Sequence, residues 1–148
     1  MFRRARYHVL LFLALAVACG VPPAVSVGRA QPSPPHEISL GAPFVLALGD
    51  AAATSTDSAA LHLSFDAVTA DSRCPRGVAC VWAGDAVVQL VVEGLSEPVL
   101  LHTNEGYETS ARVGDYEIRL EALTPQPVEG TAIAPTDYRA ELVVKQAG

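Results

Sequence analysis

Much of the chain alternates between apolar and polar residues with a period of two. Successive side chains of a β-strand point to opposite faces of a sheet, so this alternation predicts half-buried strands. In the segment 60–68 the apolar face is Leu61, Leu63, Phe65 and Ala67, and the polar face is His62, Ser64 and Asp66. Segments that we predict to be strands are 37–40, 44–48, 60–68, 85–93, 98–103, 115–123 and 137–145.

The segment 85–93 differs from the others because it is apolar on both faces apart from Gln89. Such a run is typical of a central strand that is covered on both sides. Residues 50–58 are rich in Ser, Thr and Ala, and we expect a polar loop there. With no helical period of useful length, the pattern predicts an all-β fold. We expect an antiparallel β-sandwich of about seven strands and immunoglobulin-like size, or a partly open barrel.

Two cysteines and the single tryptophan lie close together between two predicted strands. Cys74 and Cys80 are separated by five residues, whereas zinc sites space paired cysteines by two to four residues and need further ligands. In an exported chain such a pair favours a structural disulfide. We predict a Cys74–Cys80 bridge, with Trp82 packed beside it as an anchor of the core.

Two arginines, Arg73 and Arg76, belong to the same stretch and make it a candidate binding loop. They can form a small positive patch on an otherwise acidic domain. The structural alternative is that one arginine pairs with Asp71 or Asp85 while the other faces water.

The N-terminus has the pattern of an export signal. Basic residues are followed by ten apolar residues, Val9 to Ala18, which are too few to span a bilayer as a helix. Cys19 directly follows Ala16-Val17-Ala18, which resembles the bacterial lipobox, where the cysteine is lipidated. The alternative is ordinary cleavage, at Ala18 or after Ala30. We therefore predict a signal peptide at 1–18, a lipid-attachment cysteine and Pro-rich tether at 19–35, and a folded domain at 36–148.

This organisation predicts an exported protein held at the bacterial cell envelope by its lipid, or secreted if Cys19 is not lipidated. The whole chain of 148 residues carries a formal charge of −6 at pH 7. Nucleic acid is therefore not an expected partner, because phosphate binding needs clustered Lys and Arg. The expected partners are the membrane, through the anchor, and a protein or another envelope ligand.

The stretch Asp71 to Gly84 reads DSRCPRGVACVWAG. It resembles the signature of a set of small exported bacterial proteins, many of them lipoproteins, that mostly have no assigned function. The similarity extends from roughly Leu40 to Val144. It implies an all-β domain with a disulfide at Cys74 and Cys80, and it implies no catalytic or ligand residues.

The sequence contains no G-x-S-x-G, no H-E-x-x-H and no Gly-rich phosphate loop. We therefore expect no enzymatic activity and no cofactor, and predict a binding or structural accessory module. One alternative is a secreted inhibitor of an extracellular enzyme that presents the loop 75–79, and this alternative fails if Arg76 and Val78 are buried. Another is a small metal-binding envelope protein, which requires His62 and His102 to converge.

Overall fold

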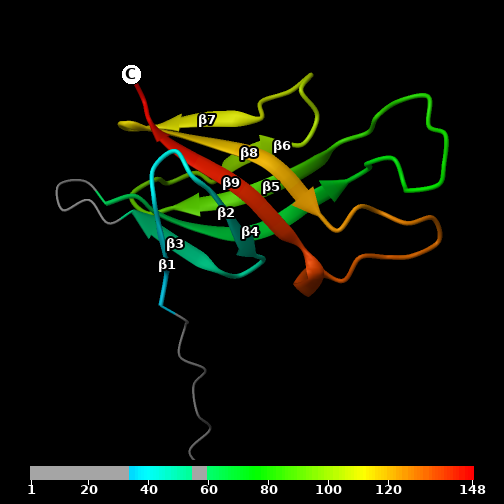
Figure 1. The fold of residues 1–148 in the computed structure, drawn as a ribbon, viewed down its shortest axis with the longest axis horizontal. Helices are drawn as coiled ribbons and strands as arrows, with labels where there is room; N and C mark the ends of the chain where they lie inside the picture. The colour runs from blue at the N-terminus through cyan, green and yellow to red at the C-terminus, as the bar shows by residue number, and fades with distance from the viewer. Residues whose placement is uncertain (1–33, 55–59) are drawn as a thin grey trace, which may run out of the picture. The chain divides into compact units, whose positions relative to one another are not determined.

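The computed structural model describes residues 34–54 and 60–148. The predicted signal peptide, Cys19 and nearly all of the predicted tether lie outside these residues. Within them the chain forms strands and one short 3₁₀ turn, η1 (Pro135–Asp137), as Figure 1 shows. The strands are β1 (His36–Ile38), β2 (Pro43–Ala47), β3 (Ala51–Thr54), β4 (His62–Asp71), β5 (Ala86–Val92), β6 (Val99–His102), β7 (Ser110–Val113), β8 (Tyr116–Thr124) and β9 (Arg139–Gln146).

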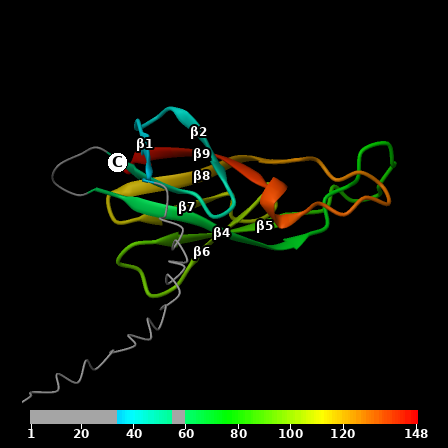
Figure 2. The same ribbon diagram turned by 90° about the horizontal axis from the view of Figure 1, so that it is seen from below.

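The strands form two sheets. One sheet has five strands in the order β1-β3-β4-β5-β6, and the other has four in the order β2-β9-β8-β7. Neighbouring strands are antiparallel except for the pair β1 and β3. Figure 2 shows β4, β5 and β6 in one layer and β8 and β9 in the other. The sheets do not close into a barrel, so the sandwich is the confirmed alternative.

The core lies between the sheets and is built from alternate residues of each strand. Along β5, Ala86, Val88, Leu90 and Val92 are buried, and the residues between them are not. Burying a Leu or Phe side chain contributes roughly 1.5–3 kcal/mol, so this layer accounts for most of the stability. The largest fully buried side chains come from both sheets: Phe65, Leu46, Leu90, Leu101, Ile118, Leu142, Val88 and Val144.

The prediction that β5 is covered on both faces is wrong. Val91 points away from the core and remains 44% exposed, and Leu100 of β6 is 46% exposed. In a two-layer sandwich each sheet has only one partner, so one face of every strand borders solvent. The apolar residues on the outer face of β5, Val87 and Val91, suggested burial on both faces although that face borders solvent.

Three register shifts change which residues point inward. The pairing of β4 with β5 shifts between Phe65 and Ala67 and again between Val68 and Ala70, and the pairing of β8 with β9 shifts between Leu120 and Ala122. An extra residue in one strand reverses the alternation beyond it. Leu123, rather than Ala122, is therefore the buried residue at the end of β8.

Two strands were not predicted. The polar loop expected at 50–58 contains β3, in which Ala52 and Ala53 pair with Leu63 and His62 of β4. The strand β7 pairs with β8 although its own sequence has little apolar contrast. In both cases the neighbouring strand supplies the pairing that the local sequence does not indicate. The segments predicted as strands at 85–93 and 98–103 pair as the antiparallel hairpin of β5 and β6. Of the described helical segments, none is long and apolar enough to cross a membrane.

Candidate functional site

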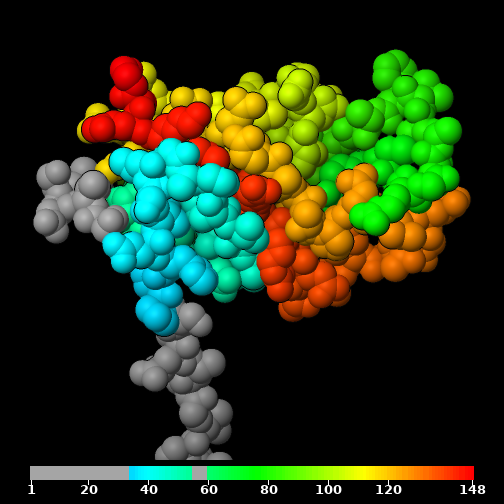
Figure 3. Space-filling view, viewed as in Figure 1, coloured from blue at the N-terminus to red at the C-terminus, as the bar shows by residue number. Residues whose placement is uncertain are grey.

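The loops between β4 and β5 and between β8 and β9 leave the same end of the sandwich. Figure 3 shows them as neighbouring green and orange surfaces. The predicted disulfide is confirmed, with the Cα atoms of Cys74 and Cys80 5.9 Å apart. It closes the loop 75–79 at this end.

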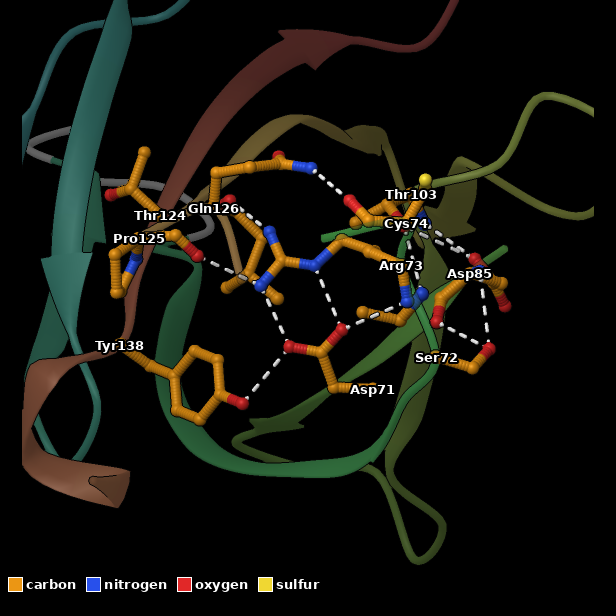
Figure 4. A network of polar contacts seen from close by, with 12 residues as sticks. Asp71, Ser72, Arg73, Cys74, Asp85, Thr103, Thr124, Pro125, Gln126 and Tyr138 are labelled. Atoms are coloured by element: carbon orange, nitrogen blue, oxygen red, sulfur yellow. Dashed lines mark hydrogen bonds and ion pairs between the residues drawn. The ribbon is translucent and has the colours of Figure 1, made fainter. Parts of the chain in front are cut away.

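Arg73 lies beneath the disulfide loop and its side chain is only 8% exposed. Its Nε and Nη2 donate to the two carboxylate oxygens of Asp71, at 2.9 and 2.7 Å. Its guanidinium also donates to the carbonyls of Leu123 and Pro125 (Figure 4). The structural alternative is confirmed for this residue. Arg73 joins two loops from the inside and does not belong to an exposed binding patch.

Asp71 is the charge partner that makes the burial of Arg73 tolerable. Burial by itself would raise the pKa of Asp71, but the hydrogen bonds from Arg73 and from the Tyr138 hydroxyl, at 3.0 Å, outweigh it. The pKa of Asp71 therefore lies below its ordinary value. The pKa of Tyr138 is raised, first by burial and then by its hydrogen bond to the Asp71 carboxylate.

Arg76 behaves differently, because its side chain is exposed to solvent. Its backbone N–H donates to the Pro127 carbonyl at 2.8 Å. The Gln126 side-chain amide donates to the Cys74 carbonyl at 2.8 Å. The disulfide loop is thus bonded along one side to the segment that follows β8.

The prediction that Trp82 anchors the core is wrong, since its side chain is 82% exposed. The space beneath the disulfide loop is occupied by Arg73, whose donors satisfy the Leu123 and Pro125 carbonyls. An indole has one N–H donor and cannot replace these bonds. Trp82 instead follows the disulfide on the outer side of the loop, before β5 begins at Ala86.

A second polar cluster fixes the strand that follows Trp82. The Oδ1 atom of Asp85 accepts hydrogen bonds from the backbone amides of Thr103 and Asn104, at 3.1 and 3.0 Å, and its Oδ2 atom lies 2.6 Å from Nδ1 of His102. Burial would raise the pKa of Asp85, but the bonds to His102, Asn104 and Thr103 lower it below its ordinary value. This cluster holds the loop after β6 against the start of β5.

The loop after β6 presents Tyr107 beside Trp82. The Tyr107 ring stacks on His102 with ring centroids 5.0 Å apart, and it stays 59% exposed. Asn104 bridges the two loops, because its amide donates to the Gly84 carbonyl at 3.0 Å and its Oδ1 accepts from the Gly106 amide at 2.9 Å. Both aromatic side chains are therefore carried by loops that are held in place.

Gly84 lies where the two ends of the loop between β4 and β5 come closest to each other. Its φ is +71°, and a Cβ atom at this position would lie 1.9 Å from the Ser72 carbonyl oxygen. Only glycine combines this backbone conformation with so close an approach.

Two adjoining clefts open at this end of the sandwich. The smaller, of about 290 Å³, is lined by Trp82, Tyr107, Asn104, Asp85, Ser72, Ala83 and Gly84. The larger, of about 490 Å³, shares Ala83, Gly84 and Asn104 with it and extends to Glu105, Glu121 and Gln126. We call the smaller one the aromatic cleft. Both Trp82 and Tyr107 line it.

The metal alternative required His62 and His102 to converge, and they do not. Leu63, next to His62, pairs with Val92 at one end of β5, while His102 pairs with Val87 near the other end. A separation of five residues along a strand is roughly 17 Å. Among residues 34–54 and 60–148, no three His, Cys, Asp or Glu side chains group in a way that would hold a metal ion.

No family model, curated protein or solved structure matches this chain.

Sequence reasoning missed the part of the site that comes from the loop after β6. Asn104, Tyr107 and His102 carry no motif, and they follow the tryptophan by about twenty residues or more. Because β5 and β6 are adjacent antiparallel strands, the loop before β5 and the loop after β6 lie at the same end of the sheet. The nearness of these two strands in the sequence was the one signal for this arrangement.

Proposed function

We propose that the folded domain is a non-enzymatic binding module of an exported lipoprotein, and that it recognises its ligand with the aromatic cleft. The observation that carries this proposal is the 82% exposure of Trp82 on a loop fixed by a disulfide and by hydrogen bonds. Tryptophan, tyrosine and arginine are the residues that dominate binding energy at protein surfaces. Here Trp82 and Tyr107 are displayed together.

The rigidity of the two loops supports recognition. Binding orders flexible side chains and loops at a cost of about 0.5–1.5 kcal/mol for each immobilised side chain. The disulfide, the Arg73–Asp71 ion pair and the Asp85 cluster fix these loops before any ligand arrives. A module that is organised in this way loses less entropy on binding.

The polar groups near the cleft support a non-enzymatic role. Asp85 and His102 form a pair of the kind that activates a serine in hydrolases. The Ser72 hydroxyl in the same cleft, however, donates to the backbone carbonyl of Asp85 at 3.0 Å and not to the imidazole. Ser72 is therefore not held as a nucleophile for this pair, and the pair positions the loop after β6.

The predicted attachment of the chain is part of the proposal. Lipidated Cys19 would hold the module at the envelope, and an extended Pro-rich segment of about 16 residues would reach roughly 50 Å. Mass spectrometry of the membrane fraction tests this directly. The expected result is a chain that starts at an acylated Cys19, and an unmodified chain starting at Gln31 would contradict it.

The inhibitor alternative is retained as a second candidate, because Arg76 is exposed and Val78 is 36% exposed. One observation weakens it. Extended peptides bind to other proteins largely through backbone hydrogen bonds, and the Arg76 amide is already bonded to Pro127. Loss of protease inhibition in an Arg76→Ala variant would favour the inhibitor over the binding module.

The test of the proposed function uses three versions of the full chain immobilised in detergent: wild type, Trp82→Ala and Val91→Ala. The control residue Val91 is apolar and exposed but lies on the outer face of β5. We expect a component of an envelope extract to be retained by wild type and Val91→Ala and to fall at least tenfold with Trp82→Ala. Equal retention by all three versions would contradict the proposal.

A further inference from the structure

The aromatic cleft has a chemical character that narrows the class of its ligand. We infer that it binds an organic cation, an ammonium or guanidinium group, seated between the Trp82 and Tyr107 rings. This inference rests on the proposed function and adds the ligand class. It draws on the aromatic rings, the charge of the surroundings and the state of the polar groups in the cleft.

The aromatic rings offer faces with negative electrostatic potential. A cation positioned over the face of Trp or Tyr is attracted by the ring, and more strongly as water is removed. Trp82 is 82% exposed and Tyr107 is 59% exposed, and both line the same cleft of about 290 Å³.

The surroundings of the cleft favour positive charge. From His36 onward the sequence has six basic residues against sixteen acidic ones. Glu105 lines the adjoining cleft, and Glu108 follows Tyr107 directly. The nearest buried cation, Arg73, is already neutralised by Asp71. A field of this sign attracts cations and repels anionic ligands.

Three polar side chains of the cleft, Asp85, Asn104 and Ser72, already have partners within the protein, which argues against a ligand that they would recognise by hydrogen bonds, such as a sugar. Both oxygens of the Asp85 carboxylate have partners, and so do both polar side-chain atoms of Asn104. The Ser72 hydroxyl donates to the Asp85 carbonyl and accepts from the Asp85 amide. A saccharide needs several directed donors and acceptors, whereas an organic cation needs aromatic faces and a negative field.

Trp82 reports on its own site, because it is the only tryptophan of the chain. The experiment titrates the full chain in detergent at constant ionic strength and follows tryptophan fluorescence. The probes are choline, its neutral isostere 3,3-dimethylbutan-1-ol, N-acetylglucosamine and the peptide Gly-Arg-Gly-amide. We expect saturable changes with choline and with the peptide, and none with the two neutral compounds.

The two cationic probes distinguish the sources of the charge. Choline binding tighter than the peptide supports a small amine as the ligand, and peptide binding about tenfold tighter supports a basic side chain of a partner protein. Either result supports the inference. An equal response to the neutral isostere, a saturable response to the saccharide alone, or no response to either cation overturns it.

Three variants separate the cation site from general changes in the loop. Tyr107→Ala is expected to weaken cation binding roughly tenfold, while Tyr107→Phe retains most of it because the ring remains. Glu105→Gln is expected to weaken binding a few-fold, and Glu97→Gln, in the distant turn after β5, to leave it unchanged. Equal affinities for Tyr107→Ala and wild type would contradict the inference.

Failure of this inference is distinguishable from failure of the proposed function. If no cation binds while Trp82→Ala still abolishes retention from the envelope extract, the ligand class is wrong and the recognition surface stands. If Trp82→Ala leaves that retention unchanged, the recognition surface itself is wrong.

Discussion

Arg73 and Asp71, two residues apart at the end of β4, form a two-point ion pair whose side chains are 8% and 12% exposed. The pair lies beneath the loop 75–79, which the Cys74–Cys80 disulfide closes. Arg73 extends from it to two carbonyls that lie 50 and 52 residues further along the chain. This contact ties the loop between β4 and β5 to the end of β8.

Removing one partner of this pair is expected to destabilise the domain strongly. An Arg73→Met variant leaves the Asp71 carboxylate and two carbonyls without their donors, and breaking a buried pair costs about 3–5 kcal/mol. The free energy of unfolding, from urea denaturation followed by circular dichroism, measures the loss. An Arg119→Met variant serves as the control, because its ion pair with Glu121 is on the surface. A loss below about 1 kcal/mol for Arg73→Met would contradict the structure.

The domain is expected to lose stability in acid. Asp71 and Asp85 both have a pKa below their ordinary value in the folded protein. Each therefore contributes stability that is present above about pH 4 and is lost as the pH falls through the lowered folded-state value. Urea denaturation between pH 7 and pH 2 measures this. An Asp71→Asn/Asp85→Asn double variant should show a flatter pH dependence, and an Asp115→Asn control should follow wild type.

The disulfide is expected to contribute modestly to stability and more to the order of the loop. Closing so short a loop contributes about 2 kcal/mol by the chain-entropy estimate. A Cys74→Ser/Cys80→Ser variant should therefore remain folded, with a free energy of unfolding lower by about that amount. Amide hydrogen exchange should speed up in residues 75–84 and stay unchanged in β5. Complete unfolding of the variant would show that the bridge has a larger role.

Truncating Trp82 and truncating Phe65 to alanine are expected to lower the free energy of unfolding by very different amounts. Trp82→Ala should change the free energy of unfolding by less than about 0.5 kcal/mol, as for other surface positions. Phe65→Ala should cost about 3–5 kcal/mol, because Phe65 is fully buried between the sheets. The tryptophan emission of the folded protein should also resemble that of indole in water. A large destabilisation by Trp82→Ala would restore the buried tryptophan of the sequence-based prediction.

Gly84 and Gly77, both in the loop between β4 and β5, allow a controlled test of its backbone conformation. Both have positive φ, +71° and +88°, but only at Gly84 would a Cβ atom collide with the Ser72 carbonyl oxygen. Gly77→Ala should cost about 1–2 kcal/mol for the left-handed conformation alone. Gly84→Ala should cost about 3 kcal/mol or more, because backbone atoms must also move. Equal losses for the two variants would mean that Gly84 and Ser72, at the two ends of the loop between β4 and β5, do not approach as closely as described.

The predictions from sequence were accurate where one strand can be judged by its own pattern. Leu63 and Phe65 of β4, and Leu142 and Val144 of β9, are buried as their alternation indicates. The patterns of β3 and β7 are too weak by themselves, because what fixes these strands is pairing with β4 and β8. The part of the candidate site that the sequence predicted is the disulfide. The disulfide depends on local spacing, whereas the pairing of Asp85 with His102 depends on a hairpin register.

The sequence by itself determined the all-β fold class and the bridge between Cys74 and Cys80, because side-chain alternation and short-range spacing are local properties. Only the tertiary structure decided that Arg73 is buried and Trp82 is exposed. The loop between β4 and β5 packs against the end of β8, where the buried carbonyls of Leu123 and Pro125 need hydrogen-bond donors. An arginine paired with a carboxylate provides those donors and an indole does not, so the charged residue fills the interior and the aromatic one remains on the surface.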